Sequence, residues 1–159
     1  MTVTVTLDDS EYFHALVAGC MRRVSARQKN RQHYYGALPA DAELLDIIGS
    51  IGEAVVAKHL DKWWVGRGQF RGGDVGEYQV RTTKYDTGHL LLNKNDYPEI
   101  PYILVTVSSG VGKIRGWLYA KEGQDKKYWK DKSERGGAFY IPQSDLTPME
   151  KLPKDLPQG

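Results

Sequence analysis

The apolar run from Tyr102 to Val107 constrains the fold of this chain more than any other segment. Its sequence, Tyr-Ile-Leu-Val-Thr-Val, lacks the regular alternation of apolar and polar residues that a half-exposed strand shows. A continuous apolar run of this length is typical of a strand that is buried on both faces. We therefore expect residues 102–107 to form a central strand. Ser109-Gly110 should turn this strand into a hairpin with residues 113–120.

A long helix is expected near the N-terminus. Asp8 followed by Glu11 resembles a capping box, in which side chains satisfy the first backbone N–H groups of a helix. Apolar residues then recur at helical spacing, which predicts a helix over residues 9–28. The apolar residues of this pattern are Phe13, Leu16, Val17, Cys20, Met21 and Val24.

A second helix is expected from Pro39 to about Leu60, because proline suits the first helical position and a broad apolar face follows. Gly49 and Gly52 lie inside it, and each glycine weakens an isolated helix by about 1 kcal/mol. We therefore expect another element to pack closely against the helix at these glycines.

The remaining segments predict a mixed α+β (α/β) fold, with a central curved mixed sheet that carries helices on at least one side. Short runs of aromatic and β-branched residues between turn residues indicate the other strands. The expected strands cover residues 2–7, 63–65, 69–70, 77–84, 89–92, 102–107, 113–120 and 139–142, and a short polar helix covers 124–132.

The length of 159 residues favours a single domain. We expect this domain to span 1–147, with a basic N-terminal part at 1–36, a core at 37–147 and a proline-containing surface extension at 148–159. The net charge of +2 is only weak evidence for an anionic partner, so the distribution of charge matters more.

Cysteine usage and hydropathy favour a cytoplasmic protein that does not enter a membrane. Cys20 is the only cysteine, which excludes an internal disulfide and fits a reducing compartment. Residues 1–10 lack the basic and apolar regions of a signal peptide, and no apolar run approaches the length that crosses a bilayer. The four histidines and Cys20 do not have the spacing of a zinc site.

A glycine-rich turn with a single carboxylate, Asp74, precedes the strand expected at 77–84. Alternate side chains of a strand point the same way, so Gln79 and Arg81 share a face, and Asp74 can converge with them. Carboxylate, amide and carbonyl oxygens suit Mg²⁺ or Mn²⁺, and the Val80 carbonyl offers one more donor. Glu53 of the second helix can add a carboxylate, and arginine can grip a phosphate. The pattern predicts metal-assisted hydrolysis of a phosphodiester.

The series of a helix Gly-Glu-Ala, then Gly-Asp-Val-Gly, then Gln-Val-Arg-Thr-Thr and a buried strand resembles the PD-(D/E)XK nuclease superfamily. The later segments Gly-Trp-Leu at 116–118 and 140–146 resemble those of small phage-encoded members. The resemblance implies a restriction-endonuclease-like αβββαβ core that binds Mg²⁺ and cuts DNA, in the host cytoplasm for a phage-encoded chain. Matched residue by residue, the helix acid is Glu53, the hairpin aspartate is Asp74, the acid or amide position is Gln79 and the lysine position is Arg81.

Two of these positions depart from the family pattern. Gln79 removes one negative charge, so the cation should bind more weakly than at a glutamate. Arg81 cannot act as a general base, because the pKa of arginine is above about 12, but it can stabilise charge on the phosphate. Glu77, on the same face, can replace the missing acid, whereas Lys84 reaches this face only through a bulge.

Structural alternatives stay open for each residue. Asp74 can be a turn aspartate, Glu53 a solvated helix acid, and Gln79 with Arg81 a solvent-exposed strand face. The second hypothesis is accordingly an inactive nuclease fold that binds nucleic acid without cutting it. A third is an interaction protein with no nucleic-acid role.

A basic run at the end of the first helix is the expected nucleic-acid contact. Such a run can also simply be solvated, because cations suit the C-terminal end of a helix. A second cluster of lysines and aromatics at 126–132 is diluted by acidic neighbours and is better read as a solvated helix. The oligomeric state stays open, with a homodimer as one alternative. The expected nucleic-acid contacts are Arg22, Arg23, Arg27, Lys29 and Arg31.

Overall fold

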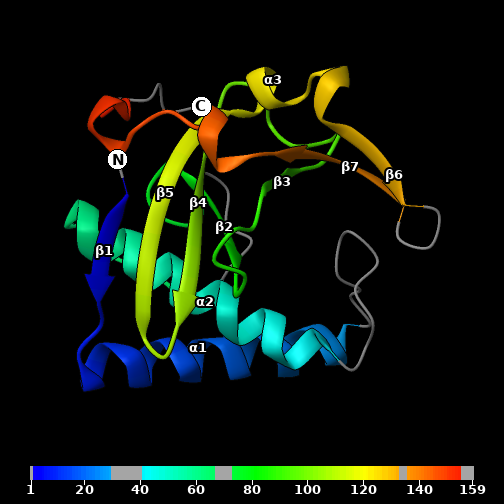
Figure 1. Cartoon of the computed structure of the whole chain (residues 1–159). Helices are drawn as coiled ribbons and strands as arrows, with labels where there is room; N and C mark the ends of the chain where they lie inside the picture. Colours follow the sequence, from blue (N-terminus) through cyan, green and yellow to red (C-terminus); the bar gives the residue numbers. More distant parts are fainter. Residues whose placement is uncertain (1, 30–40, 67–72, 133–135, 155–159) are drawn as a thin grey trace.

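Two long helices and two β-sheets form the bulk of the computed structural model, which describes residues 2–29, 41–66, 73–132 and 136–154 (Figure 1). The helices are α1 (Asp9–Gln28) and α2 (Ala42–Leu60), and a single turn, α3 (Ala120–Gly123), follows later. The mixed α+β class expected from the sequence is confirmed. Short 3₁₀ turns cover Lys126–Tyr128, Gln143–Asp145 and Met149–Lys151.

The first helix begins and ends where the sequence predicts. The backbone N–H of Glu11 donates to the Asp8 carboxylate at 2.8 Å, and the N–H of Asp8 donates back to the Glu11 carboxylate at 2.9 Å. This reciprocal capping box satisfies donors that the first turn of a helix leaves without partners. The second helix is described from Ala42 onward, and Pro39 lies outside the described residues.

The larger sheet contains β1 (Val3–Thr6), β5 (Val111–Tyr119), β4 (Pro101–Ser108) and β2 (Gln79–Thr83), in that spatial order. The prediction of a central strand is confirmed, because β4 is buried from Pro101 to Val107. The predicted hairpin is also confirmed: β4 and β5 are antiparallel and joined by Ser109 and Gly110. Both turn residues have positive φ, 49° and 77°, as a two-residue type I′ turn requires.

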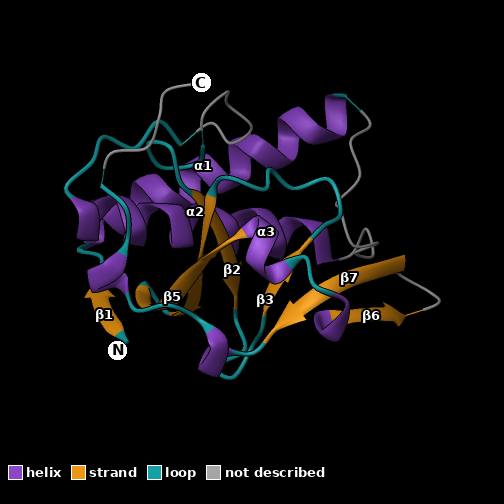
Figure 2. Ribbon diagram, turned by 90° about the horizontal axis from the view of Figure 1, so that it is seen from above, coloured by secondary structure: helices purple, strands orange, loops and turns teal. Residues whose placement is uncertain are grey.

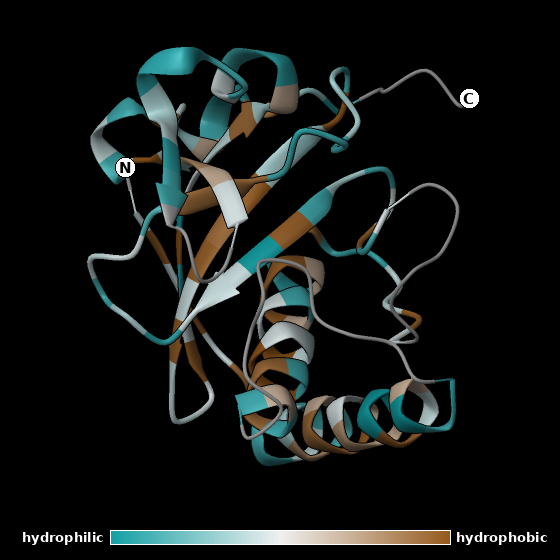
Figure 3. Ribbon diagram, turned by 90° about the vertical axis from the view of Figure 1, so that its right-hand side faces the viewer, coloured by the Kyte–Doolittle hydropathy of each residue, from teal (hydrophilic) through white to brown (hydrophobic). Residues whose placement is uncertain are grey.

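The smaller sheet contains β3 (Leu90–Leu92), β7 (Gly136–Ile141) and β6 (Trp129–Lys132), all antiparallel. It covers the face of the larger sheet opposite α2 (Figures 1 and 2). Because β2 and β4 are parallel, the chain must cross over between them, and this crossover carries β3 into the smaller sheet. Apolar residues concentrate on the long strands at the centre (Figure 3).

Alternate residues of β4 belong to two separate apolar clusters. Ile103 and Val105 pack with residues of α2, whereas Tyr102 and Leu104 pack with Leu90 and other residues of the smaller sheet. The central strand is therefore covered on one face by a helix and on the other by a second sheet, which explains its continuous apolar sequence.

The helices form a layer in which α2 lies against the larger sheet and α1 packs on α2 (Figure 1). At Gly52 the expected close packing is confirmed, since a Cβ there would lie 1.9 Å from the Thr82 hydroxyl of β2. At Gly49 the prediction is wrong, because an added Cβ would meet no atom within 4 Å among the described residues outside its own helix turn. Gly52 thus lets the helix axis approach the edge strand of the sheet.

Two predicted elements differ in the structure. Residues 63–65 do not form a strand, because this segment is bound by side chains of the two helices: Trp64 donates to Glu53, and Arg22 donates to the Gly66 carbonyl. The strand predicted at 69–70 lies outside the described residues. The polar helix predicted at 124–132 is instead a 3₁₀ turn followed by β6. Trp129 packs edge-on against Phe139 of β7 with ring centroids 5.0 Å apart, so tertiary packing overrides the helical pattern.

The segment predicted as a surface extension from residue 148 is packed into the domain as far as Leu152. Met149 and Leu152 are buried. The indole N–H of Trp117 donates to the Pro148 carbonyl at 3.0 Å, and the Tyr78 hydroxyl donates to the Pro153 carbonyl. The last five residues, 155–159, lie outside the described residues.

Candidate functional site

Glu53 and Asp74 come close together where α2 passes the edge strand β2. Glu53 directly follows Gly52, the residue that contacts β2, and it is only 5% exposed. Asp74 lies in the turn before β2, and its negative charge is near enough to raise the pKa of Glu53. The structure thus brings together the two carboxylates that the sequence assigns to one metal site.

Arg22 of α1 binds the Glu53 carboxylate through both of its terminal nitrogens. The Nη1–Oε2 and Nη2–Oε1 distances are 2.6 and 2.8 Å, and the Nε of Arg22 donates to the Gly66 carbonyl at 2.9 Å. The indole of Trp64 donates to the same carboxylate at 3.4 Å. Arg22 was expected to contact nucleic acid from the surface, but its side chain is only 15% exposed and is committed to Glu53.

Burial dominates the electrostatics of both acids. It raises the pKa of Glu53 to about 7; Arg22 opposes this shift and the charge of Asp74 adds to it. Burial also raises the pKa of Asp74, while the Val80 N–H and the charges of Arg81 and Arg22 act in the opposite direction. Two desolvated acids side by side are costly to ionise, so an additional cation at this place would be stabilised by both of them.

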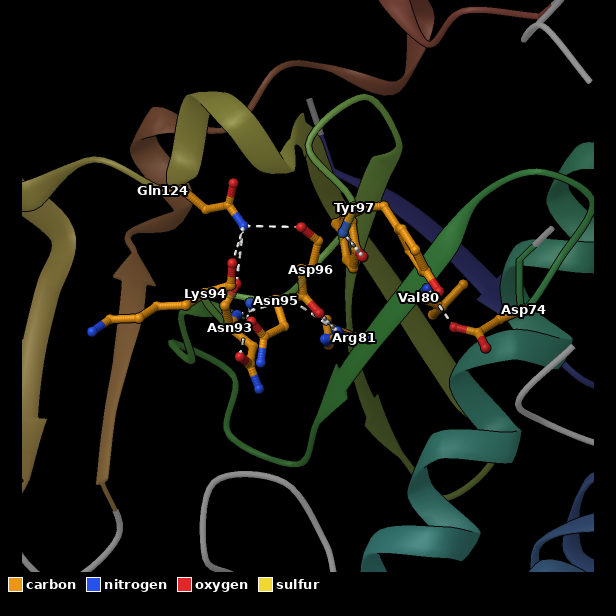
Figure 4. Close-up of polar contacts among 10 residues, drawn as sticks. Asp74, Val80, Arg81, Asn93, Lys94, Asn95, Asp96, Tyr97 and Gln124 are labelled. Carbon is orange, nitrogen blue, oxygen red and sulfur yellow. Dashed lines mark hydrogen bonds and ion pairs between the residues drawn. The ribbon is translucent and has the colours of Figure 1, made fainter. Parts of the chain in front are cut away.

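Asp74 is held at the open edge of the larger sheet. Its backbone N–H donates to the Tyr78 carbonyl at 2.9 Å, and its carboxylate accepts the Val80 N–H at 2.9 Å (Figure 4). The N–H and C=O of one strand residue point toward the same edge, so the Val80 carbonyl opens beside the Asp74 carboxylate. Because β2 is the last strand of the sheet among the described residues, both oxygens lie at the outer edge of this strand.

Gln79 and Arg81 lie on the face of β2 that is turned away from α2. The side chains of Val80 and Thr82 take the helix-facing positions, so strand alternation sends Gln79 and Arg81 to the other face. The guanidinium of Arg81 binds both oxygens of Asp96 at 3.0 and 3.1 Å (Figure 4). It also lies 4.8 Å from the centre of the Tyr102 ring. Arg81 therefore binds Asp96 rather than Asp74, and it influences Asp74 only through the electrostatic effect of its positive charge.

Asp96 is a site residue that the sequence reasoning missed. It closes a tight turn by accepting the Asn93 N–H at 2.8 Å, and Gln124 clamps the same turn by donating to the carbonyls of Asn93 and Asp96 at 3.0 and 3.1 Å (Figure 4). The polar run at 93–96 just before Pro98 signals a turn, but nothing in it points to Arg81.

The donors at the edge of β2 fit a hard divalent cation. The Asp74 carboxylate accepts the Val80 N–H, which places it at the same edge as the Val80 carbonyl, whereas the half-buried Gln79 side chain projects from the face turned away from α2. Glu53 can join them only after Arg22 leaves its carboxylate. Within residues 2–29, 41–66, 73–132 and 136–154, no three His, Cys, Asp or Glu side chains gather, so such a site would depend on amide and carbonyl oxygens.

The rest of the basic run is divided between the protein and the solvent. Arg23 lies 3.5 Å from Asp46 of α2 with its side chain 20% exposed. Arg27 and Lys29 are exposed at the end of α1, and Arg31 lies outside the described residues. Among the described residues of this run, the exposed positive charge is thus concentrated at Arg27 and Lys29.

Comparison of the chain with protein-family models, with curated proteins and with solved structures found no match. No helix in the described part of the chain is long and apolar enough to cross a bilayer. The nuclease resemblance therefore rests on its motif residues, and the function has to be argued from the chemistry of the site.

Proposed function

We propose that this chain is a Mg²⁺- or Mn²⁺-dependent nuclease of the PD-(D/E)XK type that hydrolyses phosphodiester bonds in DNA. The observation that carries the proposal is that Glu53 of α2 and Asp74 at the edge of β2 are both largely withdrawn from solvent and lie near enough for the charge of Asp74 to raise the pKa of Glu53. A helix acid and a hairpin acid that meet beside a strand carbonyl are the parts that the family's restriction-endonuclease-like core requires. In this assignment α2 is the helix that carries the acid and β2 is the strand that carries the Gln-Val-Arg motif.

The residues divide into cation ligands and phosphate contacts. Asp74, the Val80 carbonyl and the Gln79 amide would hold the cation, and Glu53 would join them after Arg22 exchanges its carboxylate for a phosphate. A divalent cation at this place supplies a Lewis acid that offsets the charge of the scissile phosphate and lowers the pKa of a coordinated water. Arg22 then remains as a nearby positive charge for the phosphate.

A non-catalytic nucleic-acid-binding protein is the alternative, and specific contacts favour it. Arg22 occupies both oxygens of Glu53, and Asp96 binds the guanidinium of Arg81. Gln79 also lacks the charge of the usual acid. If these ion pairs persist on DNA, the exposed Arg27 and Lys29 would contact phosphates without any cleavage.

A cleavage assay on supercoiled plasmid and short duplex DNA, with Mg²⁺ or Mn²⁺, separates the two functions. The nuclease proposal predicts metal-dependent cleavage that falls to background in Asp74→Ala. Asp131→Ala, which removes an exposed acid from β6, is the matched control and should cleave like the unmodified chain. Activity that survives Asp74→Ala contradicts the assignment.

Salt-dependent DNA binding without cleavage would support the alternative, because phosphate contacts release counterions and weaken as salt rises. Fluorescence anisotropy at several salt concentrations measures this directly. In that case, the double substitution Gln79→Glu with Arg81→Lys tests whether restoring the family's usual residues confers cleavage.

A further inference from the structure

The outer face of α1 carries a stripe of large apolar side chains. Phe13 is 62% exposed, Val17 40%, Met21 67% and Val24 58%, and Cys20 is exposed as well. These are the residues whose helical spacing the sequence analysis singled out, yet no described residue covers them. An amphipathic helix normally turns its apolar stripe inward, and a contiguous exposed patch on a folded protein marks an interaction surface.

The opposite face of α1 explains why the stripe points outward. Ala15 and Gly19 are buried against α2, and the Ser50 hydroxyl donates to the Ala15 carbonyl at 2.7 Å. An added Cβ on Gly19 would lie 2.7 Å from the Ile47 Cα, so only a small residue allows this approach. The small residues therefore make the contact between the helices and leave the large apolar residues on the outside.

The first turns of α2 also expose apolar side chains. Arg23 and Asp46 approach within 3.5 Å, so the first turns of α2 run beside the last turns of α1. Leu44 and Leu45, in these first turns, are 44% and 38% exposed. Large apolar side chains are therefore exposed on both helices near this end of α1.

The spacing of the stripe residues allows the stripe to pack against the same stripe of a second copy of the chain. Phe13, Val17, Cys20 and Val24 are separated by 4, 3 and 4 residues, which is the spacing of a coiled-coil seam and reads the same in both directions. With two copies antiparallel, Phe13 lies opposite Val24 and Val17 lies opposite Cys20. Each of these layers is then apolar on both sides.

The charges at the ends of α1 select the antiparallel orientation. Asp9 and the capping residue Asp8 lie at its start, whereas Arg27 and Lys29 lie at its end. An antiparallel pair brings the acidic start of one helix to the basic end of the other, and a parallel pair brings like charges together. Charge complementarity and seam spacing thus point to the same partner.

We propose that this protein forms a homodimer in which the α1 helices of two copies pack antiparallel, with the two-fold axis between Val17 and Cys20. The interface is isologous, so each copy presents the same stripe to the other. The proposal does not depend on the nuclease function, because it concerns a surface on the side of α1 away from α2.

The mass of the full chain in solution, measured by light scattering or sedimentation equilibrium, tests the dimer. The unmodified chain should have twice its chain mass of 18.0 kDa at micromolar concentrations. Val17→Glu buries a charge in the seam and should give a monomer with an unchanged circular dichroism spectrum. Tyr85→Glu, at a 65% exposed aromatic residue away from the stripe, is the control and should remain dimeric. A monomeric unmodified chain, or a dimeric Val17→Glu, overturns the proposal.

Cysteine crosslinking tests the orientation. In the antiparallel dimer Cys20 faces Val17 of the other copy, so Val17→Cys should form an intermolecular disulfide under mild oxidation, while the unmodified chain should not. Lys121→Cys, an exposed position on α3, controls for random collision. Crosslinking of the unmodified chain would mean that Cys20 of one copy faces Cys20 of the other copy, which contradicts the antiparallel arrangement.

Discussion

Replacing Glu53 with glutamine should remove a pH-dependent part of the stability of this protein. Burial and the neighbouring Asp74 raise the pKa of Glu53 to about 7, above its ordinary value of 4.5. Between these two values the folded protein keeps the proton on Glu53, whereas the unfolded chain releases it. Ionisation therefore favours the unfolded chain, and the free energy of unfolding falls as the pH rises through this window.

The difference between the two pKa values corresponds to about 3 kcal/mol. Glutamine does not titrate, so the free energy of unfolding of the variant lacks this pH-dependent decrease. The free energy of unfolding of Glu53→Gln, minus that of the unmodified chain, should therefore increase by about 3 kcal/mol between pH 4.5 and 7.5. Taking the difference at each pH cancels the contributions of the ionisable groups that do not interact with Glu53.

Urea denaturation followed by circular dichroism at a series of pH values gives this difference. Glu43→Gln, which removes an exposed acid from the same helix, is the matched control. A difference between Glu53→Gln and the unmodified chain that is constant across the window would refute the reasoning. It would show that the Arg22 pair keeps Glu53 as easily ionised in the folded protein as in water.

Three further predictions test the packing around the site. Gly52→Ala should destabilise the protein by about 1–3 kcal/mol, because its Cβ would meet the strand below, whereas Gly49→Ala should stabilise it by about 1 kcal/mol in thermal melts. Ser50→Ala removes the buried hydrogen bond to Ala15 and should cost about 1 kcal/mol in urea denaturation; no change would mean that the bond contributes nothing. Arg22→Met should cost about 3–5 kcal/mol at pH 8 and less at pH 5, measured in the same way, and an equal cost at both pH values contradicts the buried pair.

The elements that could be predicted from the sequence are those specified by local patterns. The capping box at Asp8 and Glu11 marks the start of α1, and the continuous apolar run marks β4 as the central strand. The turn at Ser109-Gly110 fixes the hairpin, because few residues tolerate positive φ. Each of these signals needs only a few neighbouring residues.

The sequence pattern does not show which face of a helix packs against the rest of the protein. Periodicity correctly identifies the apolar stripe of α1 that contains Val17, but not the side on which α2 lies. The choice depends on Ala15 and Gly19, whose small side chains allow close approach although they contribute little to the hydrophobic pattern. Spacing within one helix contains no information about its partner.

The positions of the candidate site residues also depend on contacts between segments that are distant in the sequence. Strand alternation correctly places Gln79 and Arg81 on one face, but only the contact between Gly52 and Thr82 reveals that α2 covers the other face. The partners that engage the site residues are distant in sequence: Arg22 is 31 residues from Glu53, and Asp96 is 15 residues from Arg81. No local motif specifies such pairs.

The most direct test of the metal-dependent site is a crystal of the protein soaked in Mn²⁺, examined by anomalous scattering. The account predicts a manganese peak bound by the Asp74 carboxylate and the Val80 carbonyl, with the Gln79 amide within coordination distance and Arg22 moved away from Glu53. Crystals of Asp74→Ala are the control and should lose the peak. Unchanged Arg22–Glu53 contacts with no manganese at Asp74 would contradict the account.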